Sequence, residues 1–218
     1  IKVLRMKLGE KLVLCDGTGK EFTCRLTALS DGMAEAEILS EQLSPAEPSL
    51  RCVVLAAFPK GDKAEFIVQK CTENGASEIV FFPSKRCVAR PDARSIERKT
   101  ERWQKIAASA AEQSGRGRIP QVLTLGSYAE ALKRAAEADK ALMFYENEQA
   151  VTLRMALEAG AYKTVSLLTG PEGGLEEREV EQARQAGLQV CTLGKRILRC
   201  ETAPLCALSA VMYASGEF

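Results

Sequence analysis

A glycine-rich segment near the C-terminus carries the strongest signal for ligand chemistry. Leu168–Leu175 reads LTGPEGGL, so an apolar run ends in three glycines and a proline before an acidic stretch begins. Glycines let a backbone approach a ligand closely, and ligands of open α/β sheets bind beyond the carboxyl ends of strands. The spacing matches neither the dinucleotide-binding nor the Walker pattern. An ordinary strand-to-helix turn is the alternative, but it needs one glycine rather than three, so we interpret the segment as a ligand loop.

A second segment, Leu193–Ala203, also joins an expected strand to an expected helix. It reads LGKRILRCETA and is followed by Pro204, which suits the first turn of a helix. A capped helix with a basic approach loop is the plainer interpretation, with Thr202 as the cap. Arg199 and Glu201 flank that cap at the same expected sheet edge as the first segment, which favours a functional site.

The absence of histidine limits the chemistry that this chain can perform. It removes Ser-His and Cys-His nucleophile pairs and the commonest general base near neutral pH. Any catalysis then depends on carboxylates, lysine, arginine, tyrosine, backbone groups or a cofactor. The eight cysteines form no C-x-x-C pair, so we expect neither a metal site nor a disulfide scaffold, and we expect a reducing, cytoplasmic setting. No apolar run approaches the roughly 20 residues that span a bilayer.

From residue 50 onward, buried-strand patterns alternate with helical periodicity. We expect strands at Arg51–Ala57, Glu78–Phe82, Lys140–Tyr145, Thr164–Thr169 and Gln189–Leu193. We expect helices at Ala64–Asn74, Ser95–Ser114, Tyr128–Ala138, Val151–Ala159, Glu176–Ala186 and Ala203–Ala214. This alternation predicts an α/β domain over residues 49–218, with a parallel sheet covered by helices on both faces.

The first 48 residues have a different character. Short strands are expected at Lys11–Cys15, Phe22–Leu29 and around Met33–Leu39, and residues 44–48 contain two prolines, as a linker would. This pattern predicts a small β-domain over residues 1–48. The sequence begins at Ile1 without an initiator methionine, and we expect the N-terminal part of this domain to be missing from it.

The charge of the chain is balanced overall but uneven along it. Lysine and arginine number 30 against 29 aspartates and glutamates, so no bulk positive field indicates nucleic acid. Nine basic residues nevertheless fall between Arg86 and Arg118. A solvated helix face, with Glu97 and Glu101 interleaved, explains this run as well as RNA contact does.

The two C-terminal segments together, GPEGG and LGxRILRxETA, resemble the signature of the SPOUT methyltransferases and, more narrowly, the bacterial RsmE family. The resemblance continues upstream in Pro59–Lys63, Gln69–Gly75 and Glu112–Arg116, and in Val3–Lys7 followed by Gly9. It therefore covers nearly the whole chain. Pro204-Leu205-Cys206 departs from the family, in which small residues more often open the last helix, and this departure could change how that helix packs.

The resemblance implies an N-terminal PUA-like barrel and a SPOUT domain with a deep trefoil knot, an exception to the rule against threaded chains. It implies a homodimer whose active sites are each completed near the partner subunit. The implied activity is S-adenosylmethionine-dependent methylation of uridine N3 in 16S ribosomal RNA, with the assembled 30S subunit as the expected partner. The expected cofactor wall comprises Tyr145, Glu146, Leu168, Gly170, Glu172, Gly173, Leu193, Gly194, Ile197, Leu198 and Ala203.

Catalysis by such an enzyme requires alignment of the methyl group and loss of the N3 proton. We expect Arg199 to stabilise negative charge developing on the uracil oxygen, and Glu201 to accept the proton or to orient Arg199. A carboxylate with an ordinary pKa of about 4.3 is a weak base for this step. Either burial raises its pKa, or a cation stabilises the negative charge that develops on the uracil oxygen.

With the family as context, the basic run favours RNA binding. The expected RNA contacts are Arg5, Lys7, Arg86, Arg90, Arg116 and Arg118. Two alternatives stay open: a methyltransferase of the same fold that modifies transfer RNA or large-subunit RNA, and an RNA-binding module without catalysis. An RNA-binding module without catalysis does not explain why two ligand-type loops are expected at one sheet edge.

Overall fold

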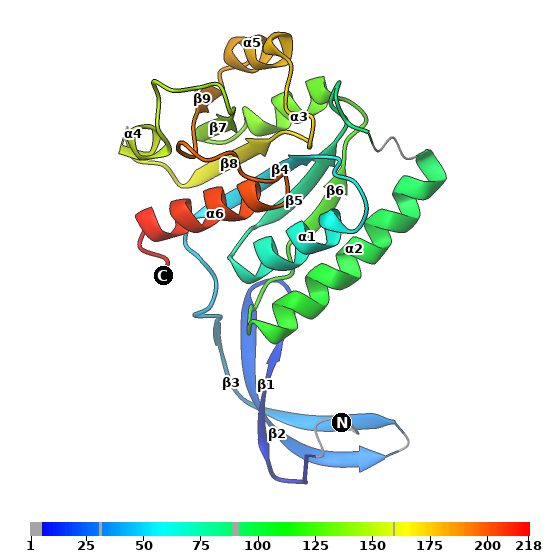
Figure 1. Cartoon of the computed structure of the whole chain (residues 1–218). Helices are drawn as coiled ribbons and strands as arrows, with labels where there is room; N and C mark the ends of the chain where they lie inside the picture. The colour runs from blue at the N-terminus through cyan, green and yellow to red at the C-terminus, as the bar shows by residue number, and fades with distance from the viewer. Residues whose placement is uncertain (1–5, 31, 89–91, 159) are drawn as a thin grey trace. The chain divides into compact units, whose positions relative to one another are not determined.

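The computed structural model describes residues 6–30, 32–88, 92–158 and 160–218. The chain divides into two compact units (Figure 1). One comprises Ile1–Glu47 together with Ala111–Ile119, and the other comprises Pro48–Ala110 and Pro120–Phe218. The sequence boundary after residue 48 does not anticipate that residues 111–119 group with the N-terminal unit.

The N-terminal unit is built on an antiparallel sheet of three strands, β1 (Lys11–Cys15), β2 (Lys20–Ser30) and β3 (Met33–Leu43), in the order β1-β2-β3. The strands lie where the sequence predicts them, although β2 and β3 are longer. Cys24 and Leu26 point into this unit and are buried. Residues 111–119 are attached to it by a backbone hydrogen bond from Gly19 to Gly117 and by the ion pair between Arg116 and Glu47.

The larger unit contains six parallel strands in the order β6-β5-β4-β8-β7-β9. Their bounds are β4 (Arg51–Ala57), β5 (Glu78–Phe82), β6 (Gln121–Thr124), β7 (Lys140–Phe144), β8 (Thr164–Thr169) and β9 (Gln189–Cys191). The central strands are apolar along their length because both faces of a parallel sheet are covered. Leu55, Phe81 and Leu167 are among the side chains without solvent exposure. The predicted parallel α/β sheet is confirmed.

Strand β6 is absent from the sequence prediction. It has only four residues and lies at the edge of the sheet, so only Val122 is buried in it. A strand this short gives no periodic pattern, and its assignment depends on pairing with β5, for example Ile79 with Val122. At the other edge, β9 ends at Cys191, two residues before the predicted end.

In the described residues a helix follows each of these strands: α1 (Lys63–Glu73), α2 (Ala93–Gln113), α3 (Tyr128–Ala135), α4 (Leu153–Glu158), α5 (Glu177–Gln185) and α6 (Thr202–Ala214). Helix α6 packs on β4, β8 and α1, whereas α3 packs on β4, β5 and β8. Figure 1 shows α3 and α6 on opposite sides of the sheet. This arrangement directs the loops that follow β7, β8 and β9 to one edge. In the described part of the chain, no helix is both long and apolar enough to cross a membrane. The trefoil knot stays a prediction, since strand order does not test it.

Candidate cofactor site

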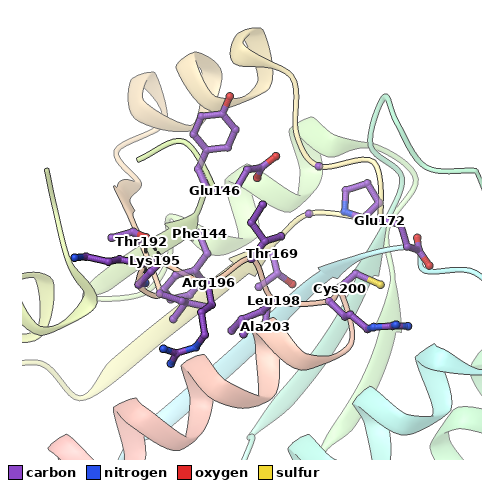
Figure 2. Close-up of a pocket in the computed structure, with 18 of the residues that line it drawn as sticks. Phe144, Glu146, Thr169, Glu172, Thr192, Lys195, Arg196, Leu198, Cys200 and Ala203 are labelled. Atoms are coloured by element: carbon purple, nitrogen blue, oxygen red, sulfur yellow. Dashed lines mark hydrogen bonds between the residues drawn. The ribbon is translucent and has the colours of Figure 1, made fainter. Parts of the chain in front are cut away.

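A cavity of about 460 Å³ lies at the carboxyl ends of β7, β8 and β9. Its wall includes the last residue of β7, Phe144, the last residue of β8, Thr169, and Thr192, which follows β9. Ligand pockets of α/β sheets form at this edge, and their volumes are typically about 300–1,000 Å³. Figure 2 shows Glu172 and Cys200 at one end of the cavity and Lys195 and Arg196 at the other.

The cavity brings both C-terminal segments together, as the sequence predicts. Nine of the expected cofactor residues line it: Tyr145, Glu146, Gly170, Glu172, Leu193, Gly194, Ile197, Leu198 and Ala203. The catalytic candidate Arg199 also lines it. These residues come from three loops that are far apart in the sequence and meet because strands β7, β8 and β9 lie side by side in the sheet.

Three expected site residues lie outside the wall. Leu168 is completely buried in β8 and faces the core. Gly173 packs beneath the segment around Arg86, whose backbone oxygen would lie 3.1 Å from a Cβ at this position. The Glu201 side chain is directed to Lys63 rather than into the cavity. In each case the sequence identifies the right segment of the chain, but only the local backbone geometry decides which of its residues face the cavity.

Several wall residues were not among the individual cofactor residues expected from the sequence: Lys63, Phe144, Thr169, Pro171, Gly174, Thr192, Lys195, Arg196 and Cys200. Most are immediate neighbours of expected residues, so the loops themselves were the available signal. Lys63 is different because it comes from α1. It lies in the Pro59–Lys63 motif, which was recognised only as part of the family resemblance.

Two glycines of the first loop are constrained, Gly170 by its neighbours and Gly174 mainly by its backbone conformation. A Cβ on Gly170 would lie 2.9 Å from Cγ of Leu175, which is itself buried. Gly174 has a φ of +68°, and a Cβ there would collide with the carboxylate of Glu146. The loop therefore needs these glycines to close against Leu175 and to place Glu146 beside the cavity.

Glu172 is held as an anion by two donors from the segment that enters α1. The Lys60 N–H and the Lys63 ammonium donate to the same oxygen, Oε1, at 3.0 and 2.9 Å. Partial burial alone would raise the pKa of Glu172, but these hydrogen bonds outweigh it and lower the pKa to about 2. The hydrogen bond to Glu172 likewise raises the pKa of Lys63 above its usual value.

Glu201 shares the same ammonium group. Its Oε2 lies 3.3 Å from Nζ of Lys63 and accepts a hydrogen bond from the Cys200 thiol at 3.2 Å. Burial alone would raise the pKa of Glu201, but hydrogen bonds from its own N–H, from Cys200 and from Lys63 lower it. Of the two alternatives, a pKa of Glu201 raised by burial is therefore not the one that the structure supports. Arg199 is exposed and forms no ion pair with Glu201 or with any other described residue.

The expected RNA contacts divide into three groups. Lys7, Arg86 and Arg118 are exposed, although Arg86 also lies 3.8 Å from Glu176 and Arg118 donates to the backbone oxygen of Thr18. Arg5 and Arg90 lie outside the described residues. Arg116 is only 4% exposed and donates to both oxygens of Glu47, at 3.2 and 2.8 Å. The expectation that Arg116 contacts RNA is wrong, because its guanidinium is used to hold residues 111–119 within the N-terminal unit.

Comparison with known proteins agrees with these features. The model of an RNA methyltransferase domain matches residues 46–212, and that of an RNA methyltransferase PUA domain matches residues 1–39. The chain is 38% identical to ribosomal RNA small subunit methyltransferase E of Bacillus subtilis, over 98% of this chain and 85% of that protein. The protein of the same name from Mycobacterium tuberculosis is 32% identical, over 96% of this chain and 80% of that protein.

A solved structure shows the same similarity. It is a ribosomal RNA small subunit methyltransferase E from Neisseria gonorrhoeae bound to S-adenosylmethionine. That chain is 40% identical, with a TM-score of 0.83 over 97% of this chain and 86% of the other. With a parallel α/β domain, a PUA-like N-terminal region and a cavity between two glycine-containing loops, this chain belongs to the RNA methyltransferase family.

Proposed function

We propose that this protein is an S-adenosylmethionine-dependent methyltransferase that modifies N3 of a uridine in 16S ribosomal RNA. The cavity that gathers Tyr145–Glu146, the 170–174 loop and the 192–203 loop at one sheet edge is the observation that carries this proposal. The small-subunit methyltransferase names of the relatives support the RNA class, and the Neisseria gonorrhoeae structure supports the cofactor.

The residues of the cavity fit an adenosine-containing cofactor with a charged amino acid tail. Phe144, Leu193 and Leu198 offer apolar surface for a purine ring. Glu146 offers a carboxylate to hydroxyl or ammonium groups. When bound, S-adenosylmethionine supplies a methyl group already activated on a sulfonium, so the protein needs only to align it and prepare the acceptor.

We assign Arg199 the role of stabilising the uracil base that accepts the methyl group. Its guanidinium is exposed at the rim of the cavity and is not engaged by a described carboxylate. A cation at this place stabilises the negative charge that a uracil oxygen acquires as the N3 proton leaves. Glu201, with its lowered pKa, is a poor proton acceptor. We therefore assign Glu201 a positioning role, and we assign solvent as the acceptor of the N3 proton.

The RNA surface in this proposal begins at the cavity rim. Lys195 and Arg196 are exposed there, and neither forms an ion pair within the described part of the chain. Arg86 in the larger unit adds positive charge. In the N-terminal unit, the exposed Lys7 and Arg118 are RNA contacts of that unit's own. Contacts of this kind predict RNA affinity that falls steeply with salt.

We further propose that the N-terminal barrel, assigned to residues 1–48 with residues 111–119 grouped beside it, binds RNA, and that residues 49–218 carry out methyl transfer. The protein acts in this proposal as a homodimer in the cytoplasm, on the assembled 30S subunit.

Nucleoside mass spectrometry of ribosomal RNA tests the function. A strain that lacks the gene should lose 3-methyluridine from its 16S RNA, and the wild-type gene should restore it. An unchanged 3-methyluridine level would exclude this target, and a changed transfer RNA or 23S RNA nucleoside would favour the other substrate class. Calorimetry with S-adenosylmethionine separates both from a non-catalytic binding module, which would release no binding heat.

A further inference from the structure

Lys63 occupies a position in its helix that is unfavourable for a positively charged side chain. It is the first residue of α1, directly after the N-cap Asp62. The N-terminus of a helix carries partial positive charge, so a cation is disfavoured there. The compensation comes from two other segments of the same unit. Glu172, in the loop after β8, lies 2.9 Å from Nζ, and Glu201, at the N-cap of α6, lies 3.3 Å from it.

These two carboxylates belong to the two different loops that meet at the cofactor cavity. Glu172 is part of the glycine-rich loop, and Glu201 ends the basic loop that contains Arg199. Both lie within ion-pair distance of the same nitrogen atom, Nζ of Lys63. The sulfur of Cys200 lies 3.6 Å from the same Nζ. The side chains of Lys63, Glu172 and Glu201 are 30%, 23% and 18% exposed, so water screens their charges only in part.

We propose that Lys63 is a positioning residue that fixes the distance between the two cofactor loops by bridging Glu172 and Glu201. This inference rests on the proposed function for its consequence, which is cofactor affinity and alignment of the methyl group. Without the ammonium, two neighbouring carboxylates face each other without a counter-charge, and their repulsion moves the loops apart. Lys63 has no proton to exchange near neutral pH, so its role is geometric.

The test uses the full chain and isothermal titration calorimetry with S-adenosylmethionine. Lys63→Met keeps an unbranched side chain that is one atom shorter and removes the charge. We expect Kd to rise about 10- to 100-fold, equivalent to about 1.4–2.7 kcal/mol. Lys63→Arg should recover most of the affinity because it restores the charge. Lys70→Met is the matched control: Lys70 lies on the same helix, and its ion-pair partner among the described residues is Glu73, at 2.8 Å, away from the cavity. Its Kd should stay within about twofold of the wild type.

A double variant separates loop positioning from a general loss of structure. In the Lys63→Met background, Glu201→Gln removes one of the two repelling charges, so affinity should improve by about threefold or more over the single variant. Hydrogen exchange supplies a readout without cofactor. Amides in residues 170–175 and 199–203 should exchange faster in Lys63→Met than in Lys70→Met, while the protection of β4 and β5 is unchanged.

Wild-type Kd in Lys63→Met, or a double variant that binds no better than the single one, would overturn the inference. Wild-type protein that gave no binding heat would instead overturn the proposed function. In that case hydrogen exchange still tests the bridge that Lys63 forms between Glu172 and Glu201. Faster exchange confined to the two loops supports the bridge, and unchanged exchange refutes it.

Discussion

Replacement of Glu172 by glutamine isolates the charge that links the glycine-rich loop to the start of α1. The amide has the same size as the carboxyl and can still accept from the Lys60 N–H, so the loop loses a charge rather than volume. The hydrogen bond from Lys63 changes from an ion pair into a weaker bond to a neutral acceptor. We expect the variant to fold and to be less stable at pH 7.

The magnitude follows from the pKa. A shift from 4.5 to about 2 corresponds to an upper bound of about 3.4 kcal/mol at 1.36 kcal/mol per unit. Because the side chain is 23% exposed, solvent screening reduces this value, and we expect a loss of about 1–2 kcal/mol in the free energy of unfolding. The folded pKa lies below the unfolded one, so this stabilisation is complete well above pH 4.5 and is lost as the pH falls toward 2.

Urea denaturation at pH 7 and at pH 4 measures both parts of this prediction. At pH 4 the unfolded carboxyl of the wild type binds protons while the folded one does not, which stabilises the unfolded state by about 0.8 kcal/mol. The advantage of the wild type over Glu172→Gln should therefore shrink by that amount between the two pH values. Glu73→Gln, which breaks the Lys70 pair on the same helix, is the control for loss of a carboxylate outside the cavity.

Two results would refute the reasoning. Equal stability of Glu172→Gln and the wild type at pH 7 would mean that Lys60 and Lys63 do not stabilise the ionised form. A stability difference that stayed constant or grew between pH 7 and pH 4 would mean that the pKa of Glu172 is not lowered by folding.

Three further predictions concern the cavity and the N-terminal unit. Arg199→Ala should lower kcat about 100-fold or more while Kd for S-adenosylmethionine changes less than about threefold; equal losses in both would remove its assignment to the acceptor. Gly174→Ala should weaken cofactor binding about tenfold or more in calorimetry, because its Cβ meets Glu146 and its φ is positive, and unchanged affinity would show that the loop relaxes freely. Arg116→Met should destabilise the fold by about 2–3 kcal/mol in urea, since it removes the guanidinium that pairs with Glu47, whereas RNA affinity of the folded protein should keep its salt dependence. A reduced salt slope with normal stability would instead restore Arg116 to the RNA surface.

The sequence predicted the fold best where burial repeats along the chain. Strands β4, β5 and β8 end at the predicted residues because they are continuous apolar runs bounded by turn residues. Strand β6 was missed because four residues at a sheet edge carry no pattern of their own. The sequence did not indicate that residues 111–119 contact the N-terminal unit, because their attachment, through Arg116 and Glu47, joins positions 69 residues apart.

For the site, the sequence by itself determined the two loops, their place at one sheet edge and the chemistry left to a chain without histidine. Glycines, prolines and strand ends are local properties, so spacing is enough to find them. Only the tertiary structure decided that Lys63 joins Glu172 to Glu201, that both carboxyls have lowered pKa values, and that Arg199 is left unpaired among the described residues. The physical reason is that the ionisation of a group depends on which charges lie within a few ångströms of it, and the partners here are more than 100 positions apart in the chain.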